Sequence, residues 1–575
     1  MVEKRNETLE LQPKGRRTVQ RLRKHPNDCY IGSITNLLRH RASAETSKPG
    51  SHEQASCGTI ADIGNNHVVR ATRLHPYRTE LGNTCCHDAA LKEASDIQHK
   101  PSWMSVACGI AVPTLRKSMS RRRKDGDDVE NRTAEDTRHY GNRALLAYDF
   151  SSREQEMSGS KPFDVAIVGG GIAGLTLAIG LLKHKIPVTI YESAHHFGEI
   201  GAGVYFSPNA ARAMNGIDPS ITAGFERVAT ANKDPALENV WFEFRHGEDS
   251  VNGKSGDLFC RMGWEGSQSH GGVHRAKFLD ELIKLIPDGV AHFGKRVAAI
   301  DQVGDKVKLT FKDGPGATHD CVVGCDGIHS ETRKFILGPD DPALNAVFSG
   351  KYCHRGLVPM EEAVAALGED SATNSQNYVG HHGHLLTFPV EKGKVFNAVA
   401  FSSCETWDYE KWVVQSDVKN INEDFKNFGA PVQKVINMMR DTDIWALFQY
   451  LPARTFYSGH VVMIGDAAHA TTPHQGSGAA MAIEDAYVLS SLLANVNHAS
   501  KLEAAFNAFD AVRRQRGWDL VTTSAEAGTI WELEHPVIGD DFDKFRENAT
   551  SRMDWIWGED LEIEVKQGLQ LLASM

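Results

Sequence analysis

The sequence lacks several features that would place it in other classes of protein. It has no run of about 18 apolar residues, which is the length that a membrane-spanning helix needs. Its ten cysteines include no Cys-x-x-Cys pair, and Cys321 and Cys325 have no matching second pair or His cluster beside them. No internal repeat is evident. We therefore expect no membrane span, no metal site and no repeat architecture.

Positive charge is scarce outside the first part of the chain. Residues 1–160 contain 26 Lys and Arg against 20 Asp and Glu, whereas the whole chain has a net charge of −11. Residues 161–575 therefore carry a net charge of −17. A protein that binds nucleic acid needs clustered Lys and Arg to neutralise phosphates. We therefore expect an acidic enzyme body without a nucleic-acid partner, preceded by a basic leader.

The leader, residues 1–158, shows no sustained period of 2 or 3.6 residues that would indicate strands or amphipathic helices. Its basic run Arg121–Lys124 is followed by acidic residues and is typical of a solvated segment. We predict a disordered extension or a translated non-coding stretch. Acidic residues near the start disfavour a mitochondrial presequence, and no apolar core resembles a secretory signal. We expect a cytoplasmic protein, with organellar targeting left open.

An ordered pattern begins at Phe163. Residues 164–169 form a continuous apolar run that ends in glycine, as in a strand that is buried on both faces of a parallel sheet. Apolar and small residues at 172–184 predict a buried helix, and residues 187–191 predict the next strand. Together these segments make a βαβ unit, which is typical of an α/β fold.

A dinucleotide-binding fingerprint joins these segments. Gly169, Gly171 and Gly174 form a Gly-x-Gly-x-x-Gly turn between the strand and the helix, and Glu192 ends the second strand. The first glycine permits a tight turn, the second lets the backbone approach a pyrophosphate, and the third lets the helix pack close to the sheet. Glu192 is predicted to bind the adenosine ribose. The fingerprint does not distinguish FAD from NAD.

Later segments alternate between sheet-like and helical patterns. Helices are predicted at 276–286, 478–494, 501–516 and 541–572, and strands at 306–311, 321–324, 384–388, 395–401 and 460–464. The strand-like pieces between about 345 and 450 predict a sheet over which a substrate can lie. A chain of 575 residues is too long for one core, so we expect two folded units plus appendages.

The strand predicted at 460–464 leads into a second glycine-rich segment. Asp466 follows the strand and offers an acceptor for hydroxyl groups. Pro473, Gly476, Gly478 and Ala479 belong to a stretch with few large side chains, which can pass close to a flat ring. The helix that begins near Gly478 would direct its N–H groups at an electron-rich edge of that ring.

Residues 460–486 resemble the Gly-Asp motif of flavoprotein monooxygenases. Residues 325–330 resemble the Asp-Gly motif of the same family, and the three motifs follow one another in the family's order. From about residue 161 onwards the chain is therefore similar to the group A FAD-dependent aromatic hydroxylases, of the fungal, salicylate hydroxylase-like type. The resemblance implies that Asp466 binds the flavin ribityl chain and that Asp326 serves both FAD and the nicotinamide donor.

The same resemblance implies a fold like that of para-hydroxybenzoate hydroxylase, an α/β architecture in which a Rossmann-type FAD-binding domain carries an inserted β-sheet substrate domain and C-terminal helices. It also implies that Gly203 and Arg275 contact FAD, although Arg275 also fits a plain surface cation. The predicted domains are a disordered extension at 1–158, an FAD-binding domain at 159–340 with some substrate-domain strands, a mainly substrate-binding sheet at 341–450, the second part of the FAD-binding domain at 451–500, and C-terminal helices at 501–575.

The reaction that the resemblance implies consumes O2 and a nicotinamide donor. NADH or NADPH reduces FAD, O2 adds to give a flavin C4a-hydroperoxide, and one oxygen atom is transferred to a phenolic or salicylate-like ring. No second complete Gly-x-Gly-x-x-Gly turn is present, so the donor is expected to dock transiently. We expect a monomer or a homodimer.

Two candidate catalytic residues come from the sheet region. Arg355 resembles an arginine that holds the substrate phenolate in related fungal hydroxylases of phenolic polyketides, and a guanidinium suits a phenolate or a carboxylate. A structural ion pair is its alternative role. His384, with His382 nearby, is a candidate proton shuttle, and a structural role is its alternative. Phe388 stands where the dearomatising relatives have tyrosine, which favours decarboxylating or plain hydroxylation here.

Two other functions remain open at this stage. The same FAD-binding architecture serves flavin-dependent hydroxylases and epoxidases of polyketide or isoprenoid secondary metabolites. A protein of another class, in which FAD is bound without catalysis, would also carry the first glycine turn. The intact segment from Asp466 to Gly478 disfavours the non-catalytic alternative, because a structural flavin has no need of a loop shaped around its reactive ring.

Overall fold

A computed structural model describes residues 160–197, 203–266, 269–415, 418–440 and 442–575. All of them belong to one of the two units into which the chain divides, Glu135–Met575. The predicted N-terminal extension lies outside the described residues, and so does the segment 198–202 that precedes Gly203. Among the described helices, none is long and apolar enough to cross a bilayer.

The first glycine turn lies at the end of a central strand of a six-stranded sheet. In order across this sheet the strands are β18 (Tyr457–Ser458), β19 (Val461–Met463), β11 (Cys321–Gly324), β1 (Val165–Val168), β2 (Val188–Tyr191) and β7 (Ala291–His292). β1 pairs in parallel with β2 and β11, and α1 (Ile172–Lys183) connects β1 to β2. Every residue of β1 is buried, as expected for a strand covered on both faces. The predicted βαβ unit is confirmed.

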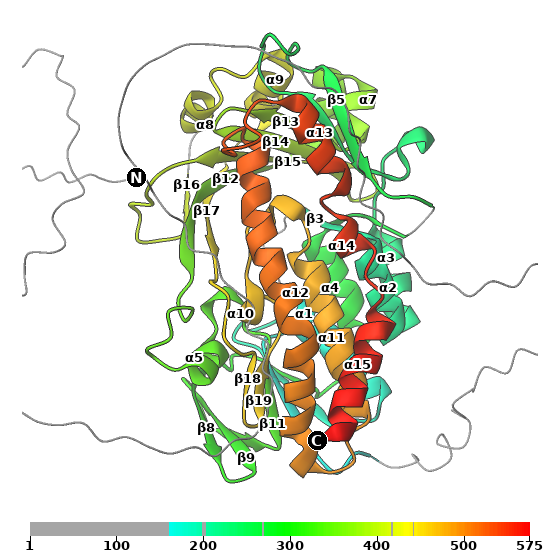
Figure 1. Ribbon diagram of the computed structural model, residues 1–575, viewed down its shortest axis with the longest axis vertical. Helices are drawn as coiled ribbons and strands as arrows, with labels where there is room; N and C mark the ends of the chain where they lie inside the picture. Colours follow the sequence, from blue (N-terminus) through cyan, green and yellow to red (C-terminus); the bar gives the residue numbers. More distant parts are fainter. Residues whose placement is uncertain (1–159, 198–202, 267–268, 416–417, 441) are drawn as a thin grey trace, which may run out of the picture. The chain divides into compact units, whose positions relative to one another are not determined.

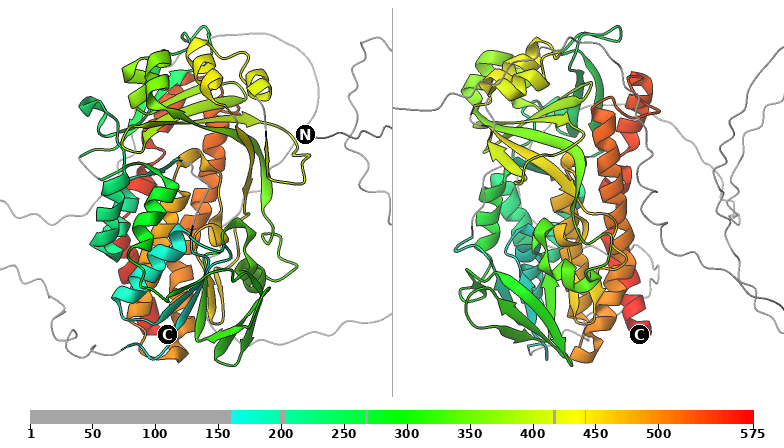
Figure 2. Two further views of the ribbon diagram at one scale, coloured as in Figure 1. Left: turned by 180° about the vertical axis from the view of Figure 1, so that it is seen from behind. Right: turned by 90° about the vertical axis from the view of Figure 1, so that its left-hand side faces the viewer.

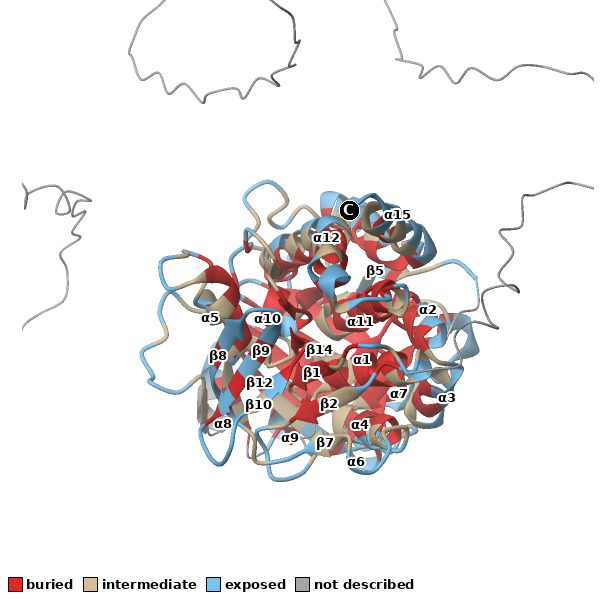
Figure 3. Ribbon diagram, turned by 90° about the horizontal axis from the view of Figure 1, so that it is seen from below, coloured by how far each residue is buried: buried red, intermediate tan, exposed pale blue. Residues whose placement is uncertain are grey.

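Apolar side chains of the sheet, its helices and a small second sheet form one core. Among these helices are α1, α2 (Pro208–Ile217), α3 (Pro219–Val228), α4 (Arg275–Ile283) and α11 (Gly478–Ala494). The second sheet contains β8 (Val297–Val303), β9 (Lys306–Phe311) and β10 (Ala317–His319). Figure 3 shows the buried residues of β1, α1 and α11 at the centre, while β8 and β9 have exposed outer faces. A Cβ at Gly180 would lie 2.8 Å from the Ser490 hydroxyl, so α1 and α11 pack at a glycine contact.

A large mixed sheet forms the other half of the described body (Figures 1 and 2). Its strands in order are β16 (Val413–Gln415), β17 (Asp443–Gln449), β12 (Val347–Pro359), β15 (Val395–Ser403), β14 (Gly383–Val390), β13 (Gln376–Gly380), β4 (Val240–His246) and β5 (Leu258–Gly263). The sheet predicted between residues 345 and 450 is confirmed. β4 and β5 extend it from within residues 159–340, where the prediction expected some substrate-domain strands without giving their bounds.

The two faces of this sheet pack against different partners. One face is covered by α6 (Met360–Leu367), α7 (Glu369–Thr373), α8 (Val418–Asp424) and α9 (Ala430–Met438). In β15, Phe396 and Ala400 join the core on that side, whereas Val399 and Phe401 line a cavity on the other side. This alternation follows from the two-residue period of a strand. Alternate side chains of β15 therefore point toward the cavity and toward the helices.

The C-terminal helices differ from the prediction in length and number. α12 spans Leu502–Trp531, so the predicted end at residue 516 was too early. The single helix predicted at 541–572 is instead α13 (Phe542–Ser551), α14 (Asp554–Trp557) and α15 (Leu561–Ser574). The Asp560 side chain accepts a hydrogen bond from the Glu562 N–H at 3.1 Å, which caps a new helix directly after Gly558. A cap of this kind starts a new helix even where apolar residues continue with a helical period on both sides of it.

Arg513 is a fully buried cation that ties three helices together. From α12 its guanidinium donates to Glu484 and Asp485 of α11, each at 2.9 Å, and to Glu564 of α15 at 2.6 Å. These carboxylates raise the pKa of Arg513 although burial alone would lower it. Arg516, at the predicted end of this helix, is a second buried cation, and it interrupts the apolar pattern by which the end of α12 was predicted.

We expect Arg513→Ala to destabilise the protein by about 3–5 kcal/mol, because it leaves buried carboxylates without their partner. The measurement is the denaturation midpoint of the FAD-loaded protein. Arg440→Ala is the control, since Arg440 pairs with Glu362 at 2.7 Å on the surface and exposed pairs contribute about 1 kcal/mol or less. Equal midpoints for the two variants would contradict the structural role of Arg513.

Candidate functional site

The first glycine turn joins β1 to α1, and its shape depends on glycine at two positions. Gly169 has a φ of +104°, and a Cβ there would lie 2.3 Å from the carbonyl oxygen of Cys325. A Cβ on Gly174 would lie 2.0 Å from the carbonyl oxygen of Gly169. Gly171 differs, because nothing lies within 4 Å of the position that its Cβ would take. The turn therefore leaves space for a ligand at the N-terminus of α1.

Glu192 follows β2 and holds this turn in place. One carboxylate oxygen accepts a hydrogen bond from the Gly170 N–H at 2.7 Å. The other oxygen accepts from the Ala194 N–H at 2.7 Å and from the Ser193 hydroxyl at 3.1 Å. The side chain is only half-buried, so part of the carboxylate stays accessible. Its predicted contact with an adenosine ribose stays a prediction.

A cavity of about 300 Å³ extends from the first glycine turn to the large sheet. The predicted site residues on its wall are Gly171, Gly203, Arg275, Arg355, Asp466, Pro473, Gly476, Gly478 and Ala479. The predicted site residues that lie off the wall are Gly169, Gly174, Glu192, Asp326 and His384. The wall also contains residues that were not predicted as site residues, among them Tyr205, Trp241, Phe244, Asn377, Phe388, Phe401, His474 and Trp531. The structure thus brings together segments that are far apart in the chain.

Asp326 caps a helix instead of facing the cavity. Its carboxylate accepts hydrogen bonds from the Ser330 hydroxyl at 2.6 Å, from the Glu331 N–H at 2.8 Å and from the Thr332 N–H at 3.0 Å. These contacts fix the start of α5 (Glu331–Leu337). Burial raises the pKa of Asp326, and the hydrogen bonds oppose this effect. Its predicted role toward FAD and the nicotinamide donor stays a prediction, while Gly327 beside it does line the cavity.

Arg333 of α5 positions the Gly-Asp segment through its buried guanidinium. It donates hydrogen bonds to the carbonyl oxygens of Ala467 at 3.0 Å and Ala468 at 2.9 Å, and it lies 3.8 Å from the centre of the Tyr450 ring. Burial lowers the pKa of Arg333 to about 10, so the group keeps its charge at neutral pH. Arg333 lies just beyond the Asp-Gly motif and was not predicted as a site residue. Its role became visible when the fold placed α5 against the segment after Asp466.

The Gly-Asp segment presents its carboxylate to the cavity. β19 leads to Gly465, which has a φ of +60° and donates its N–H to Asp485 at 3.0 Å. α10 (Asp466–His469) then begins, and the Asp466 side chain is exposed on the cavity wall between buried neighbours. Gly476 has a φ of +56°, and a Cβ there would lie 3.0 Å from the Trp241 ring. Glycine at these positions lets the backbone bend tightly around the cavity.

The large sheet supplies a cation and several polar atoms to the far end of the cavity. Arg355 of β12 lies on the wall, with its guanidinium carbon 4.9 Å from the centre of the Trp445 ring. No salt bridge joins it to a carboxylate among the described residues, and both its predicted substrate role and the alternative structural role stay predictions. The buried Asn377 Oδ1 and Trp241 Nε1 also have no partner among the described residues. Buried polar atoms without partners in a cavity indicate a polar ligand.

His474 is a wall residue that the sequence analysis quoted in a motif but did not single out. It lies in a short 3-10 turn, Pro473–Gln475, and both of its buried ring nitrogens lack a partner among the described residues. α12 holds it in place, because the Trp531 indole N–H donates to its carbonyl oxygen at 3.1 Å. Burial lowers the pKa of His474 well below its ordinary value. The imidazole is therefore neutral at pH 7, with a lone pair on one ring nitrogen.

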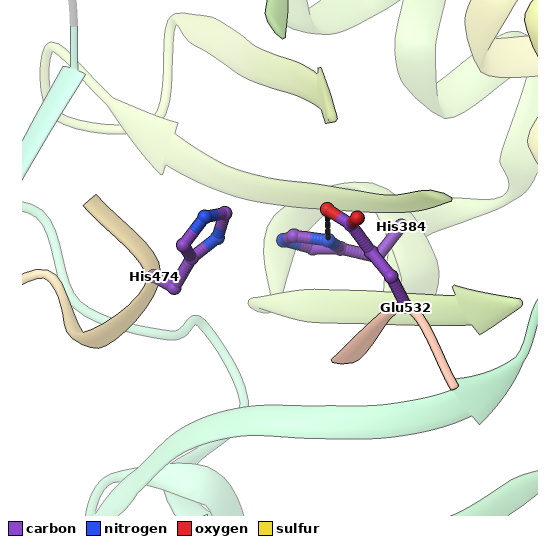
Figure 4. Close-up of side chains that lie close together, drawn as sticks. All are labelled: His384, His474 and Glu532. Atoms are coloured by element: carbon purple, nitrogen blue, oxygen red, sulfur yellow. Dashed lines mark ion pairs between the residues drawn. The ribbon is translucent and has the colours of Figure 1, made fainter. Parts of the chain in front are cut away.

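His384, a predicted catalytic residue, lies behind His474 and not on the wall. Its ring stacks on Phe401 with the centroids 4.4 Å apart, and its centroid is 5.3 Å from that of His474. Its Nδ1 lies 3.3 Å from a carboxylate oxygen of Glu532, the residue that follows α12 (Figure 4). His382 is on the surface, in the turn between β13 and β14. The structure therefore leaves His384 no direct contact with a ligand in the cavity.

One group among the described residues has the composition of a metal site. The ligand atoms of His384, His474 and Glu532 all lie within 4.8 Å of one another. The ammonium group of Lys351 contacts the same Glu532 carboxylate, and a fixed positive charge there disfavours a metal cation. The absence of a metal site, which the sequence predicted, stays a prediction.

The residues on the wall fit an extended dinucleotide cofactor. The open space beside Gly171 and the N-terminus of α1 suits a pyrophosphate, and the exposed Asp466 carboxylate suits hydroxyl groups. Gly478 leaves room at the start of α11, where the atoms nearest to an added Cβ are 3.5 Å away or farther. A flat ring can therefore approach the backbone at that helix N-terminus.

Comparisons with known proteins agree with this geometry. Residues 287–524 match a model for an FAD binding domain, and residues 167–213 match one for an NAD(P)-binding Rossmann-like domain. The chain is 43% identical to 6-methylsalicylate 1-monooxygenase of Aspergillus terreus over 425 residues, which are 73% of this chain and 94% of that protein. It is 37% identical to a salicylate hydroxylase of Pseudomonas putida over 427 residues, which are 72% of this chain and 95% of that protein.

A solved structure supports the same assignment at the level of the fold and the sequence. A salicylate hydroxylase substrate complex superposes with a TM-score of 0.63 and 34% identity, over 71% of this chain and 98% of that chain. The Rossmann-type FAD-binding fold and the FAD cofactor that the sequence predicted are thereby confirmed. The chain belongs to the family of FAD-dependent monooxygenases that includes the salicylate hydroxylases.

Proposed function

We propose that this monooxygenase hydroxylates a small phenolic acid of the salicylate type, with NADH or NADPH as the electron donor. The observation that carries the proposal is the far end of the cavity, where Arg355 provides a cation, His474 provides a neutral base, and aromatic rings surround both. A guanidinium binds a carboxylate or a phenolate well. The apolar walls favour a flat ring over a sugar or a peptide.

The protein groups have separate tasks in this mechanism. FAD, when bound, supplies the activated oxygen atom after reduction by the nicotinamide donor and contact with O2. The first glycine turn, Glu192 and Asp466 would hold the cofactor. Arg355 orients the substrate anion, and a ring nitrogen of His474 takes the phenol proton, so that the ring becomes electron-rich for attack. The aromatic wall keeps water away from the reacting atoms.

Phe388 bears on the outcome of the reaction. It lies on the cavity wall, with its ring centroid 6.1 Å from that of Tyr205 and 6.4 Å from that of Phe242. Burial raises the pKa of Tyr205, so its hydroxyl stays protonated. Phe388 lacks the hydroxyl group that the tyrosine of the dearomatising relatives provides at this position. We therefore place decarboxylating or plain aromatic hydroxylation ahead of dearomatisation.

Several broader features of the proposal rest on the sequence. The proposed compartment is the cytoplasm, and the proposed state is a monomer or a homodimer. The proposed division assigns residues 159–340 and 451–500 to FAD binding, 341–450 mainly to the substrate, and 501–575 to the closing helices. The described cysteines are free thiols, as is usual in a reducing compartment.

A product analysis tests the proposed substrate class. The FAD-loaded full chain would be screened with salicylate, 6-methylsalicylate, other hydroxybenzoates and a terpenoid alkene, with NADH and NADPH in turn. We expect hydroxybenzoates to stimulate donor oxidation and to incorporate one atom of 18O from 18O2. Epoxidation of the alkene without ring hydroxylation would favour the secondary-metabolite alternative, and an FAD protein that no compound stimulates would favour a non-catalytic role.

A further inference from the structure

His474 on the cavity wall is the inner end of a continuous series of titratable side chains. Behind it lie His384 and Glu532, all three being buried from solvent. One nitrogen or oxygen atom of each residue lies within 4.8 Å of the corresponding atoms of the other two, and the His384 Nδ1 to Glu532 contact is 3.3 Å. A separation of this size is spanned by one bridging water or by a small ring rotation. Figure 4 shows the two imidazoles and the carboxylate facing one another.

The series continues from Glu532 to the surface. The second Glu532 oxygen accepts hydrogen bonds from the Ser403 hydroxyl, at 2.6 Å, and from the Lys351 ammonium. Lys351 also donates to Glu534 at 3.0 Å. Glu534 in turn lies 2.8 Å from Nδ1 of His382, whose side chain is 79% exposed. Four separate segments contribute to the series, namely the Pro473–Gln475 turn, β12, the β13–β14 hairpin and the end of α12.

The groups of the series alternate in charge. Glu532 and Glu534 carry two negative charges around the single positive charge of Lys351. Burial would raise the pKa of Glu532, but its contact with His384 and the positive charge of Lys351 hold that pKa at about 2. Burial lowers the pKa of both His384 and His474, so the two imidazoles are neutral at pH 7. A proton on either ring is therefore short-lived, and the Glu532 carboxylate beside His384 offers an acceptor for the next transfer.

A series that was only structural would satisfy its polar atoms. Both ring nitrogens of His384 and of His474, and one oxygen of Glu532, lack a well-formed hydrogen bond among the described residues. Buried atoms of this kind are available to an ordered water or to a transferred proton.

We propose that His474, His384, Glu532, Lys351, Glu534 and His382 form a proton path between the cavity and solvent. The proposal rests on the proposed function, in which a phenol is ionised in the cavity. The phenol O–H bond breaks, its proton passes to a ring nitrogen of His474, and a proton leaves His382 for bulk water. Each carrier between them gains one proton and loses one, so no group is oxidised or reduced. The path also runs in reverse when the product takes up a proton.

The test uses a ligand whose ionisation can be seen. The FAD-loaded full chain would be mixed in a stopped-flow instrument with 5-nitrosalicylate, whose phenolate absorbs visible light, in weak buffer with a pH indicator. The absorbance reports when the proton leaves the ligand, and the indicator reports when it reaches solvent. We expect both signals to appear together in the wild-type protein, and to slow down in D2O.

Two variants interrupt the path at different points. Glu532→Gln removes the charge with little change of shape, and His384→Phe keeps the ring that stacks on Phe401. We expect each variant to bind FAD and 5-nitrosalicylate but to form the phenolate at least about tenfold more slowly. Added imidazole buffer should restore part of the rate. His381→Gln is the matched control, because His381 pairs with Glu248 at 2.9 Å on the surface outside the series.

The outcomes separate this inference from the proposed function. If wild-type protein that carries FAD does not bind 5-nitrosalicylate, the proposed substrate class is wrong. If the ligand binds but its ionisation has the wild-type rate and pH profile in both variants, the path is wrong. An unchanged wild-type rate in D2O would overturn the path even if neither variant folds. Stoichiometric metal in the purified protein that Glu532→Gln removes would show a metal site instead.

Discussion

Asp466→Ala should give a folded protein that no longer retains FAD. Asp466 is exposed on the cavity wall, while its neighbours Gly465 and Ala467 are buried, so the carboxylate is available to a ligand and contributes little to the core. Losing hydrogen bonds to a charged acceptor costs about 1.5–3 kcal/mol, which corresponds to an FAD affinity about 10- to 150-fold weaker. The measurement is the FAD content after gel filtration, followed by titration of the apoprotein with FAD.

Asp466→Asn provides a graded comparison for that result. The amide keeps one oxygen acceptor but loses the negative charge, so we expect an FAD affinity between those of the wild-type protein and Asp466→Ala. Far-UV circular dichroism of all three proteins should be the same. Full FAD retention by Asp466→Ala would show that the carboxylate does not contact the cofactor, and the predicted direction of the cofactor in the cavity would then be wrong.

Arg355→Ala should bind FAD normally and lose coupling between donor oxidation and hydroxylation. The residue lies at the end of the cavity formed by the large sheet, whereas the first glycine turn lies at the other end. Without the guanidinium, an anionic ring is held less firmly, and reduced flavin reacts with O2 to give hydrogen peroxide. We expect the ratio of product to oxidised donor to fall at least about tenfold, since misplacement by about 1 Å can slow a reaction about 100-fold.

Arg355→Lys is the matched variant for this experiment. Lysine keeps the charge but not the planar, two-pronged donor, so we expect partial coupling and a raised KM. The ratio of hydroxylated product to NADH consumed, together with a peroxide assay, distinguishes the three proteins. An Arg355→Ala enzyme that remained fully coupled would remove this residue from the mechanism and would leave His474 as the main polar contact of the substrate.

The local elements of the cofactor site were predictable because they depend on short-range chemistry. Gly169 and Gly174 are required by contacts within a few residues or with the adjacent strand, so their spacing carries the information. The strand before Asp466 and the helix after Gly478 follow from apolar runs and their boundaries. The same reasoning located β14 and β15, although it assigned no strand to β4 and β5.

The substrate end was less predictable because its residues come from distant segments. Arg355 and His384 lie on strands that are near neighbours in the sheet, yet only Arg355 reaches the wall. His474 was quoted in the Gly-Asp motif, and its importance depends on α12 packing against it. Asp326 illustrates the opposite case, because a motif pointed to a cofactor role while its carboxylate caps α5.

The sequence by itself determined the family, the cofactor and the local shape of the two glycine-rich turns, since these depend on residue types at fixed spacing. The tertiary structure alone decided which side chains share the cavity and which stand behind it. Strand register sets the face to which each residue points, and the buried cations Arg333 and Arg513 bind partners more than 25 positions away. Those long-range contacts leave no local pattern in the chain, which is why the series from His474 to His382 appears only in the folded protein.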